Sequence, residues 1–355
     1  MAGGGGTRLR PLSTAQRPKP FLPLLPEGET LLARTVARLQ GPELGPTPDI
    51  AVVVSDAWAP LVAAQVPGVR IIVEPEGRNT AAAVALAALA GDRDPEAIMV
   101  VLPADHRIDP AREALFRTVL RDAADGLATG SFGIASPLVT LGVEVNRAAT
   151  EYGYLRPKVG LRQRIAGLDA YPLEAFEEKP AAARAAELLA MPGVAWNAGM
   201  FLWRRRAILA ALEAHDPEVV DGVRRGLASG DLAAAYAALP GRSIDYAVME
   251  PAAAAGDVVM AAMDVGWTDV GTWPALLDVL GAAGIEGGVV EAGTSVPVTG
   301  GDLIVERGPS GPTVREVAGG TITADGPMAL LHHAAHARAI VQALLDRCAA
   351  AEARA

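Results

Sequence analysis

The chain has 355 residues, a length that predicts one large domain with a smaller one attached. Its formal net charge of −10 argues against a nucleic-acid partner, because nucleic-acid binders normally present a basic face. A single cysteine, Cys348, excludes an internal disulfide framework and is typical of a reducing compartment. The start of the chain lacks an apolar signal region, and the longest apolar run, Thr80 to Ala90, is too short to span a bilayer. We therefore expect a cytoplasmic protein with no membrane partner.

The glycine-rich start of the chain has the composition of a phosphate-binding loop. Glycine adopts backbone angles barred to other residues, so such a loop can point several N–H groups at one anion. Arg8 adds a permanently charged fork and Lys19 a compact positive charge. The spacing excludes the two better-known phosphate loops, G-x-x-x-x-G-K-[ST] and G-x-G-x-x-G. We predict a polyphosphate clamp, with a flexible chain end as the alternative. Its expected members are Gly3, Gly4, Gly5, Gly6, Thr7, Arg8 and Lys19.

Short apolar runs alternate with helical patterns over the following hundred residues. Buried strands are predicted at 50–54, 69–73 and 97–102, and helices at 29–39, 57–65, 81–90 and 110–124. This alternation predicts an α/β fold with a doubly wound sheet. Ligands bind beyond the carboxyl ends of strands in such sheets, so residues 74–80 and 105–106 are expected to line the site.

Several residues at these strand ends are candidates for binding. Asp105 is a candidate Mg²⁺ ligand, because Mg²⁺ favours one or two carboxylates plus substrate phosphates, although a lone aspartate after a strand is also typical of a turn. His106 either positions a nucleotide or is a structural histidine. Arg78, Asn79 and Thr80 lead into an alanine-rich helix that should be buried. We expect Asn79 or Thr80 to cap that helix and its first turn to face the base and ribose, with capping alone as the alternative.

The pattern of residues changes after about residue 281, from long helical segments to short apolar ones. Short glycine- and valine-rich segments run from 287 to 323, and a helix is predicted from about His333 to Ala353. We predict a catalytic domain over 1–282 and a β-rich, β-helix-like appendage with a terminal helix over 283–355. His332, His333 and His336 lack the H-E-x-x-H pattern, so ordinary structural histidines are favoured over a metal site.

Eight separated strings follow one another in an order that resembles the sugar-phosphate nucleotidylyltransferases. The first is G-G-x-G-T-R-L-x-P-L with a later P-K-P, and E-P-x-x-R-N-T-A and L-P-A-D-H resemble the mannose-1-phosphate guanylyltransferase branch in particular. The others are Y-G-Y at 152–154, F-E-E-K-P at 176–180, W-N-A-G-M-F at 196–201, S-I-D-Y-A-V-M-E at 243–250 and G-W-T-D-V-G-T-W at 266–273. The resemblance implies a Rossmann-like mixed sheet of the nucleotide-diphospho-sugar transferase type.

The resemblance also implies a reaction and a set of roles. GTP and α-D-mannose 1-phosphate would give GDP-mannose and pyrophosphate, with Mg²⁺ as the cofactor. The glycines would bind the triphosphate, Arg8 the leaving pyrophosphate and Lys19 the α-phosphate. Asp105 and Asp269 would hold Mg²⁺. The sugar phosphate would be bound by Gly153, Glu178, Lys179 and Asn197. Lys179 supplies a cation for its phosphate, whereas Glu178 and Asn197 suit hydroxyl groups; a solvated surface ion pair is the alternative for Glu178 and Lys179.

Other functions and two departures from the family pattern stay open at this stage. The same chemistry on glucose 1-phosphate with UTP or dTTP is one alternative, and a non-catalytic regulatory homologue that binds sugar nucleotides is another. Relatives have a hydrophobic strand before the glycines, whereas this sequence has only Met1 and Ala2 there. We expect an upstream start, an empty sheet position with unpaired neighbours and a mobile loop. Glu151 also stands where the family commonly has glycine. A homodimer through the C-terminal region is a further expectation.

Overall fold

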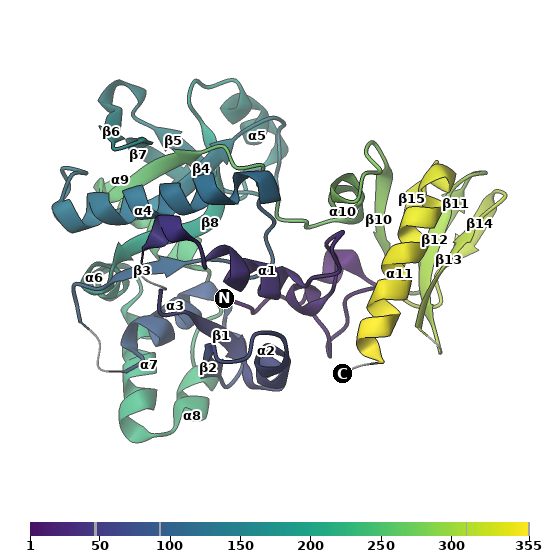
Figure 1. Ribbon diagram of the computed structural model, residues 1–355, viewed down its shortest axis with the longest axis horizontal. Helices are drawn as coiled ribbons and strands as arrows, with labels where there is room; N and C mark the ends of the chain where they lie inside the picture. The colour runs from purple at the N-terminus through teal and green to yellow at the C-terminus, as the bar shows by residue number, and fades with distance from the viewer. Residues whose placement is uncertain (46–47, 92–93, 310, 354–355) are drawn as a thin grey trace.

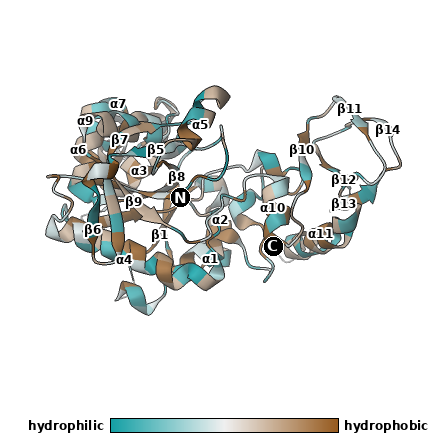
Figure 2. Cartoon of the chain, turned by 90° about the horizontal axis from the view of Figure 1, so that it is seen from above, coloured by the Kyte–Doolittle hydropathy of each residue, from teal (hydrophilic) through white to brown (hydrophobic). Residues whose placement is uncertain are grey.

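The computed structural model describes residues 1–45, 48–91, 94–309 and 311–353, so a few residues of each predicted domain lie outside the description. Two views at right angles place the strands β10 to β15 and the last helix at one end of the molecule, away from the larger sheet (Figure 1 and Figure 2). Among the described residues, no helix combines the length and apolar composition needed to cross a membrane.

The first part of the fold is a small parallel sheet flanked by helices. Strand β1 (Ala51–Ser55) pairs in parallel with β2 (Arg70–Glu74), as the two apolar runs predict. Residues 1 and 2 then connect β1 to the segment after β3 (Ile98–Val101). Ala2 N–H donates to the Val53 carbonyl at 2.9 Å, and Ala104 N–H donates to the Met1 carbonyl at 2.9 Å. The expected empty sheet position is filled in part: residues 1 and 2 pair with both neighbours, whereas β1 and β2 still form a sheet separate from that of β3.

The second part is a mixed sheet of seven strands. In addition to β3 it contains β4 (Leu138–Glu144), β5 (Tyr154–Pro157), β6 (Gln163–Ile165), β7 (Leu168–Glu177), β8 (Ala195–Arg204) and β9 (Val258–Met263). The order is β3-β8-β4-β9-β7-β5, with β6 beside β7. β4 and β9 run parallel, whereas β8 is antiparallel to β3 and β4. The predicted Rossmann-like mixed sheet is confirmed.

Nine helices accompany the two-stranded sheet of β1 and β2 and the seven-stranded sheet in the described part of the chain. They are α1 (Leu31–Arg38), α2 (Ala59–Gln65), α3 (Asn79–Leu89), α4 (Glu113–Thr129), α5 (Ala182–Leu189), α6 (Arg205–His215), α7 (Pro217–Ser229), α8 (Leu232–Ala237) and α9 (Glu250–Ala255). The alanine-rich α3 is buried, as predicted, and packs against α6 and α7. Small side chains on α3 allow this close approach from more than one side.

The C-terminal part is β-rich and ends in a helix, as predicted. After α10 (Trp273–Val279) come β10 (Glu286–Val290), β11 (Ser295–Val298), β12 (Leu303–Gly308), β13 (Gly311–Glu316), β14 (Gly320–Thr323), β15 (Met328–His332) and α11 (Arg338–Glu352). The described strands form antiparallel pairs in sheets ordered β10-β15-β12-β13 and β11-β14. They therefore differ from the stacked parallel coils of a β-helix.

One hydrophobic core joins the start of the chain to the C-terminal part. Leu9, Leu12 and Leu22 are fully buried in the same cluster as Trp273 and Leu344. Polar contacts support the same junction: Trp273 Nε1 donates to the Arg10 carbonyl at 2.9 Å, and Arg307 Nε donates to the Pro11 carbonyl at 3.1 Å. The segment that follows the glycine loop is therefore held from the C-terminal side.

Candidate active site

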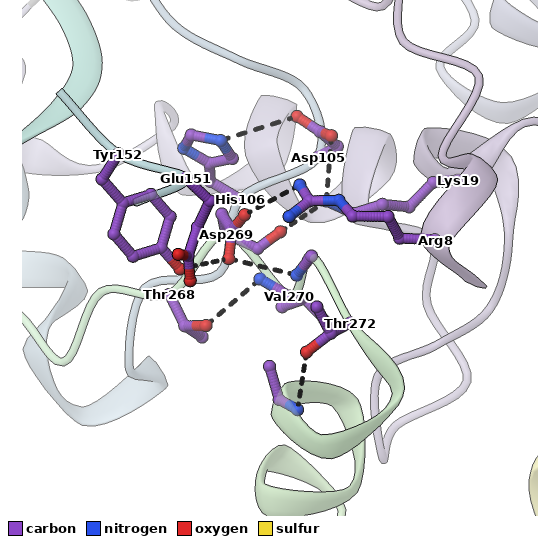
Figure 3. A network of polar contacts seen from close by, with 12 residues as sticks. Arg8, Lys19, Asp105, His106, Glu151, Tyr152, Thr268, Asp269, Val270 and Thr272 are labelled. Carbon is purple, nitrogen blue, oxygen red and sulfur yellow. Dashed lines mark hydrogen bonds and ion pairs between the residues drawn. The ribbon is translucent and has the colours of Figure 1, made fainter. Parts of the chain in front are cut away.

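Lys19 enters, beside Arg8, a polar network in which Asp105 and Asp269 meet (Figure 3). It begins a short 3₁₀ helix, Lys19–Phe21, and its side chain is only 5% exposed. Its Nζ donates to Asp105 Oδ2 at 2.9 Å and also to the backbone carbonyl of Asp269. Three residues far apart in the sequence are thus joined by one ammonium group.

Gly6 is required for the position of this lysine. It has a left-handed φ of 62°, and a Cβ at this position would lie 2.5 Å from the Cβ of Lys19. The Ser13 hydroxyl donates to the Gly6 carbonyl at 2.6 Å and fixes the turn. Arg8 follows two residues later, with Nη2 3.5 Å from Asp269 Oδ2. A Cβ added to any of Gly3, Gly4 or Gly5 would meet nothing within 4 Å, so these glycines leave space along their backbone.

Asp105 and His106 follow β3, as predicted from the third apolar run. Burial opposes ionisation of Asp105, but Lys19 and His106 still hold the pKa of this carboxyl below its ordinary value. His106 Nε2 lies 3.8 Å from Asp105 Oδ1, and its Nδ1 accepts a hydrogen bond from Trp267 Nε1 at 3.2 Å. Burial lowers the pKa of His106, which favours a neutral ring with its proton on the Asp105 side.

Asp269 is fixed by a tyrosine that sequence reasoning did not single out. Tyr152 donates its hydroxyl proton to Asp269 Oδ1 at 2.8 Å, and Gly271 N–H donates to the same oxygen at 3.1 Å. Burial and the Asp269 carboxylate raise the pKa of Tyr152, so it stays a donor. Glu151 lies beside it in the network of Figure 3 and pairs with Arg147. The signal for Tyr152 was its place in the Y-G-Y string.

A second cluster forms around Asn197 on β8. Glu178 follows β7, and Lys179 Nζ lies 2.9 Å from Glu178 Oε1. Burial opposes the charge of Lys179, but Glu178 still raises its pKa. Gly153 lies close to both Glu178 and Asn197: a Cβ at Gly153 would overlap Glu178 Oε2 and lie 3.4 Å from the Asn197 Cβ. The structure therefore brings the four predicted sugar-phosphate residues together, and gives Gly153 the further role of admitting Glu178.

Asp245 belongs to this second cluster, although the sequence analysis assigned it no role. It begins a π-helical turn, Asp245–Met249, a rare conformation that often occurs at functional sites. Its Oδ1 accepts a hydrogen bond from Asn197 Nδ2 at 2.8 Å. Burial and the nearby Glu178 raise the pKa of Asp245 to about 7. Its position within the S-I-D-Y string was the available signal.

The predicted base- and ribose-binding residues contact a different segment. Arg78 bonds Glu76 and the Ala237 carbonyl, Asn79 Nδ2 donates to the Gly241 carbonyl at 3.4 Å, and Thr80 Oγ1 accepts from Ile244 N–H. Asn79 Oδ1 accepts from the Thr80 N–H at 2.8 Å, and Asn79 has a left-handed φ of 65°, so Asn79 engages one first-turn donor of α3, whereas the Thr80 side chain bonds outside the helix. Arg78 occupies the N-cap position without a side-chain bond to the helix. The Ala81 N–H donates to the Arg242 carbonyl at 3.2 Å, so this first-turn donor is already engaged.

Two other sequence expectations concern groups outside these clusters. Glu74, expected to line the site, is 4% exposed, and burial raises its pKa to about 7, so it lies in the interior. His332 Nδ1 lies 3.3 Å from Asp302 Oδ2, and the His333 N–H donates to Asp302 Oδ1. Among the described residues, no group of three or more His, Cys, Asp or Glu side chains is arranged to hold a metal ion.

The comparisons with known proteins identify the family of the chain. Residues 1–283 match the family model described as Nucleotidyl transferase. Over 294 residues the chain is 38% identical to the xanthan biosynthesis protein XanB of Xanthomonas campestris, and over 299 residues it is 38% identical to a mannose-1-phosphate guanylyltransferase of Escherichia coli K12. Both alignments cover 79% of this chain and 58% of the relative, so the chain spans just over half the length of these relatives.

A solved structure is similar as well. It is described as a mannose-1-phosphate geranyltransferase from Thermus thermophilus, with 36% identity and a TM-score of 0.63, and the match covers 79% of this chain and 77% of that one. The resemblance noted from the separated strings is thereby confirmed at the level of the family. The chain belongs to the nucleotidyl transferase family.

Proposed function

We propose that this chain transfers GMP from GTP to α-D-mannose 1-phosphate, giving GDP-mannose and pyrophosphate. The observation that carries the proposal is the network in which Lys19 joins Asp105 to Asp269, with Arg8 and the glycine loop beside it. Relatives named mannose-1-phosphate guanylyltransferase at 38% identity support this choice of nucleotide and sugar.

The proposed reaction is an in-line displacement at the α-phosphorus of GTP. A phosphate oxygen of the sugar phosphate forms the new bond to that phosphorus, and the bond to the bridging oxygen of the β-phosphate breaks, so pyrophosphate leaves. The attacking oxygen is already ionised at neutral pH, so no general base is required. Catalysis then consists of positioning and charge neutralisation. Lys19 is assigned to the α-phosphate, Arg8 to the leaving pyrophosphate, and the N–H groups of Gly3 to Gly6 to the triphosphate.

The carboxylates of Asp105 and Asp269 fit a Mg²⁺ ion. Lys19 bonds the carboxylate of Asp105 and the backbone carbonyl of Asp269, so the two aspartates lie near each other, and Mg²⁺ typically takes one or two carboxylates with substrate phosphates completing its shell. When bound, the ion would neutralise phosphate charge during the displacement. Tyr152 and the Gly271 N–H orient Asp269 for this role.

The cluster around Asn197 is proposed to bind the sugar phosphate. Lys179 is the cation for its phosphate, and Glu178 and Asn197 hold hydroxyl groups. Binding of the nucleotide is likewise proposed for four further residues, Arg78, Asn79, Thr80 and His106. A cytoplasmic location and a homodimer through the C-terminal region likewise stay predictions.

The test is pyrophosphate release by the full chain with Mg²⁺, over a panel of GTP, UTP and dTTP against mannose 1-phosphate and glucose 1-phosphate. We expect release with GTP and mannose 1-phosphate that is abolished by EDTA. Loss of one electrostatic stabiliser typically costs about 10²- to 10³-fold in turnover, so Asp269→Asn should lose activity on that scale. Preferred turnover of another pair would contradict the assigned substrates. Near-normal turnover of the Asp269→Asn variant would contradict the metal assignment, and binding without release would identify a non-catalytic homologue.

A further inference from the structure

Arg147 and Glu151 form an ion pair at the edge of the large sheet where Asp269 also lies. Their loop follows β4, which runs parallel to β9, and Asp269 comes after the end of β9. Both segments therefore leave the sheet at the same edge. Tyr154 fixes this loop, because its hydroxyl accepts from the Ala149 N–H at 2.8 Å and donates to the Ala149 carbonyl at 2.9 Å. The ion pair thus stands on a loop with a defined position.

The guanidinium of Arg147 lies over two aromatic rings as well as beside Glu151. It is 5.4 Å from the centre of the Tyr152 ring and 5.5 Å from the centre of the Trp196 ring, and the two rings meet edge to face. The negative faces of such rings attract a cation. The side chain of Arg147 is also 52% exposed, so a ligand can reach it. Loss of the Glu151 contact would therefore leave the guanidinium held by the rings and open to another anion.

Tyr152 and Gly153 connect this ion pair to both clusters of the site. The Tyr152 hydroxyl donates to Asp269, whereas the Gly153 carbonyl accepts from the Asn197 N–H at 2.8 Å. In the proposed reaction the sugar lies at the Asn197 cluster, and its phosphate has to reach the nucleotide beside Asp269. The phosphate therefore belongs between the two clusters, where Arg147 covers the Tyr152 ring.

Glu151 places a negative charge where the proposed reaction brings a phosphate. Burial opposes ionisation of Glu151, but Arg147 holds the pKa of this carboxyl below its ordinary value, so it is charged at neutral pH. The Asp269 carboxylate opposes the same charge, and both acids belong to one network (Figure 3). Glu151 also stands where the family commonly has glycine. Its pair with Arg147 is therefore a departure of this chain from the family pattern.

We propose that Arg147 is a further cation for the phosphate of the sugar 1-phosphate, and that Glu151 occupies the place of this phosphate on Arg147 until the substrate binds. This inference rests on the proposed function and deepens its sugar-phosphate site. A phosphate dianion can displace the carboxylate, because it carries more charge and fits the planar guanidinium with two hydrogen bonds. An exposed ion pair adds little stability, so breaking it has a small cost. Glu151 then turns toward solvent.

Four proteins test this exchange: the wild-type chain, Glu151→Gln, Arg147→Gln and the double variant. Glutamine removes the charge of Glu151 and keeps its length. The KM for mannose 1-phosphate should fall about two- to fivefold in Glu151→Gln, the range that corresponds to breaking an exposed ion pair. It should rise by about tenfold or more in Arg147→Gln, the scale for losing a hydrogen bond to a charged group. In the double variant the gain from Glu151→Gln should disappear, because the competition requires Arg147.

Two alternatives give different results in the same four proteins. If Glu151 only repels phosphate through its charge, the KM for mannose 1-phosphate falls by the same factor with and without Arg147. If the pair only stabilises the loop, both single variants have a lower Tm and neither lowers this KM. Either result would overturn the proposal, and so would an equal change in the KM for GTP. Inhibition by mannose, which carries no phosphate, should be the same for Glu151→Gln and the wild-type chain, and a gain there would contradict a contact with phosphate.

The matched control is Glu213→Gln. Glu213 is exposed and pairs with Arg224 between α6 and α7, so this variant makes the same change in charge at an ion pair elsewhere. It should leave the KM values for both substrates unchanged. A decrease in the KM for mannose 1-phosphate equal to that of Glu151→Gln would show that net charge alone is responsible, which would overturn the exchange.

The substrate panel separates this proposal from the proposed function. The four proteins are compared with the sugar 1-phosphate that the panel identifies, so an error in the sugar or the base does not affect the outcome. Turnover without the predicted dependence on Arg147 would overturn the exchange alone. If no pair is turned over, the proposed function fails, and calorimetric titration of the four proteins with mannose 1-phosphate decides on the exchange. Tighter binding by Glu151→Gln only where Arg147 is present would then support it, and equal or absent binding would overturn it.

Discussion

Gly6 and Lys19 depend on each other for their positions. The lysine side chain passes so close to the backbone of Gly6 that a single added carbon at Gly6 would overlap it. The left-handed backbone of Gly6 separately disfavours any residue with a side chain. Lys19 can therefore occupy its buried position only because Gly6 has no side chain.

The Gly6→Ala variant should displace Lys19 from Asp105. Misplacement of a catalytic group by about 1 Å commonly costs about 10²-fold, so we expect kcat/KM for the proposed reaction to fall on that scale. Gly160→Ala is the matched control, because a Cβ there meets nothing within 4 Å and its backbone is not left-handed. Steady-state kinetics of both variants test this, and equal activities would show that Lys19 tolerates the added carbon.

The sequence predicted these residues individually but not the ties between them. Glycines, Arg8 and Lys19 were recognisable because charge and backbone freedom are local properties. The bond from Tyr152 to Asp269 joins residues 117 positions apart, and no periodicity encodes such a distance. Asn79 and Thr80 were predicted as caps from residue type, and Asn79 does accept from the Thr80 N–H, but both side chains also bond the segment 241–244, which the local sequence does not indicate.

At the level of elements, one buried aspartate organises the turn that leads into β12. Asp302 is fully buried. Its two oxygens accept from the Thr299 N–H and hydroxyl and from the His333 N–H, and His332 lies beside them. Burial alone would raise the pKa of Asp302, but these donors lower it to about 2. This turn thereby joins β12 to the end of β15.

The Asp302→Asn variant should be less stable at neutral pH, because its amide group places a donor against other donors. Such a loss typically costs about 1–3 kcal/mol in unfolding free energy. The folded carboxyl has a pKa of about 2 against an ordinary 3.8, so its stabilisation is complete above about pH 4 and is lost as the pH falls toward 2. Thermal melts at pH 7 and pH 3 should show a difference in Tm that shrinks at the lower pH.

The exposed Asp325 in the same region provides a control for Asp302. Asp325→Asn should melt with the wild-type chain at both pH values. An undiminished Tm difference for Asp302→Asn at pH 3 would show that the carboxylate charge is not what stabilises the turn.

The positions of strands and helices were easier to predict than the order and direction in which the strands pair. Apolar runs located β1, β2 and β3, but the prediction that all three are buried is wrong for β2 and β3, because Val73 and Val100 are exposed. The antiparallel direction of β8 between β3 and β4 depends on long-range topology, which no local pattern records. The antiparallel pairing of β10 to β15 was missed for the same reason, since glycine- and valine-rich segments suit coils and hairpins equally.

At the level of the whole molecule, the segment after the glycine loop and the C-terminal part share one core. Leu344 on α11 is fully buried in the cluster that contains Leu9 and Leu12. These two leucines directly follow the glycine loop. A loss of packing near the C-terminal end of the chain should therefore disturb the proposed triphosphate site.

The Leu344→Ala variant should show both effects. A buried leucine-to-alanine change costs about 2–5 kcal/mol of unfolding free energy, and we expect the KM for GTP to rise as the loop loses support. Leu212→Ala, fully buried in a different cluster on α6, should lose similar stability with an unchanged KM for GTP. Denaturant unfolding and kinetics at a temperature where both variants are folded make the comparison. Equal KM values would show that the two regions are energetically independent.

The shared core also restricts how such chains can be recombined. A cut between the predicted domains at residue 282 would divide Leu9 and Leu12 from Leu344 and Leu303, although it falls in a short connection between α10 and β10. A chimera that takes its C-terminal part from a relative would need matching side chains at the beginning of its own sequence. Residues near 9–25 and near 303–345 therefore have to match each other in size and shape. We expect the residue types in these two segments to co-vary among related sequences.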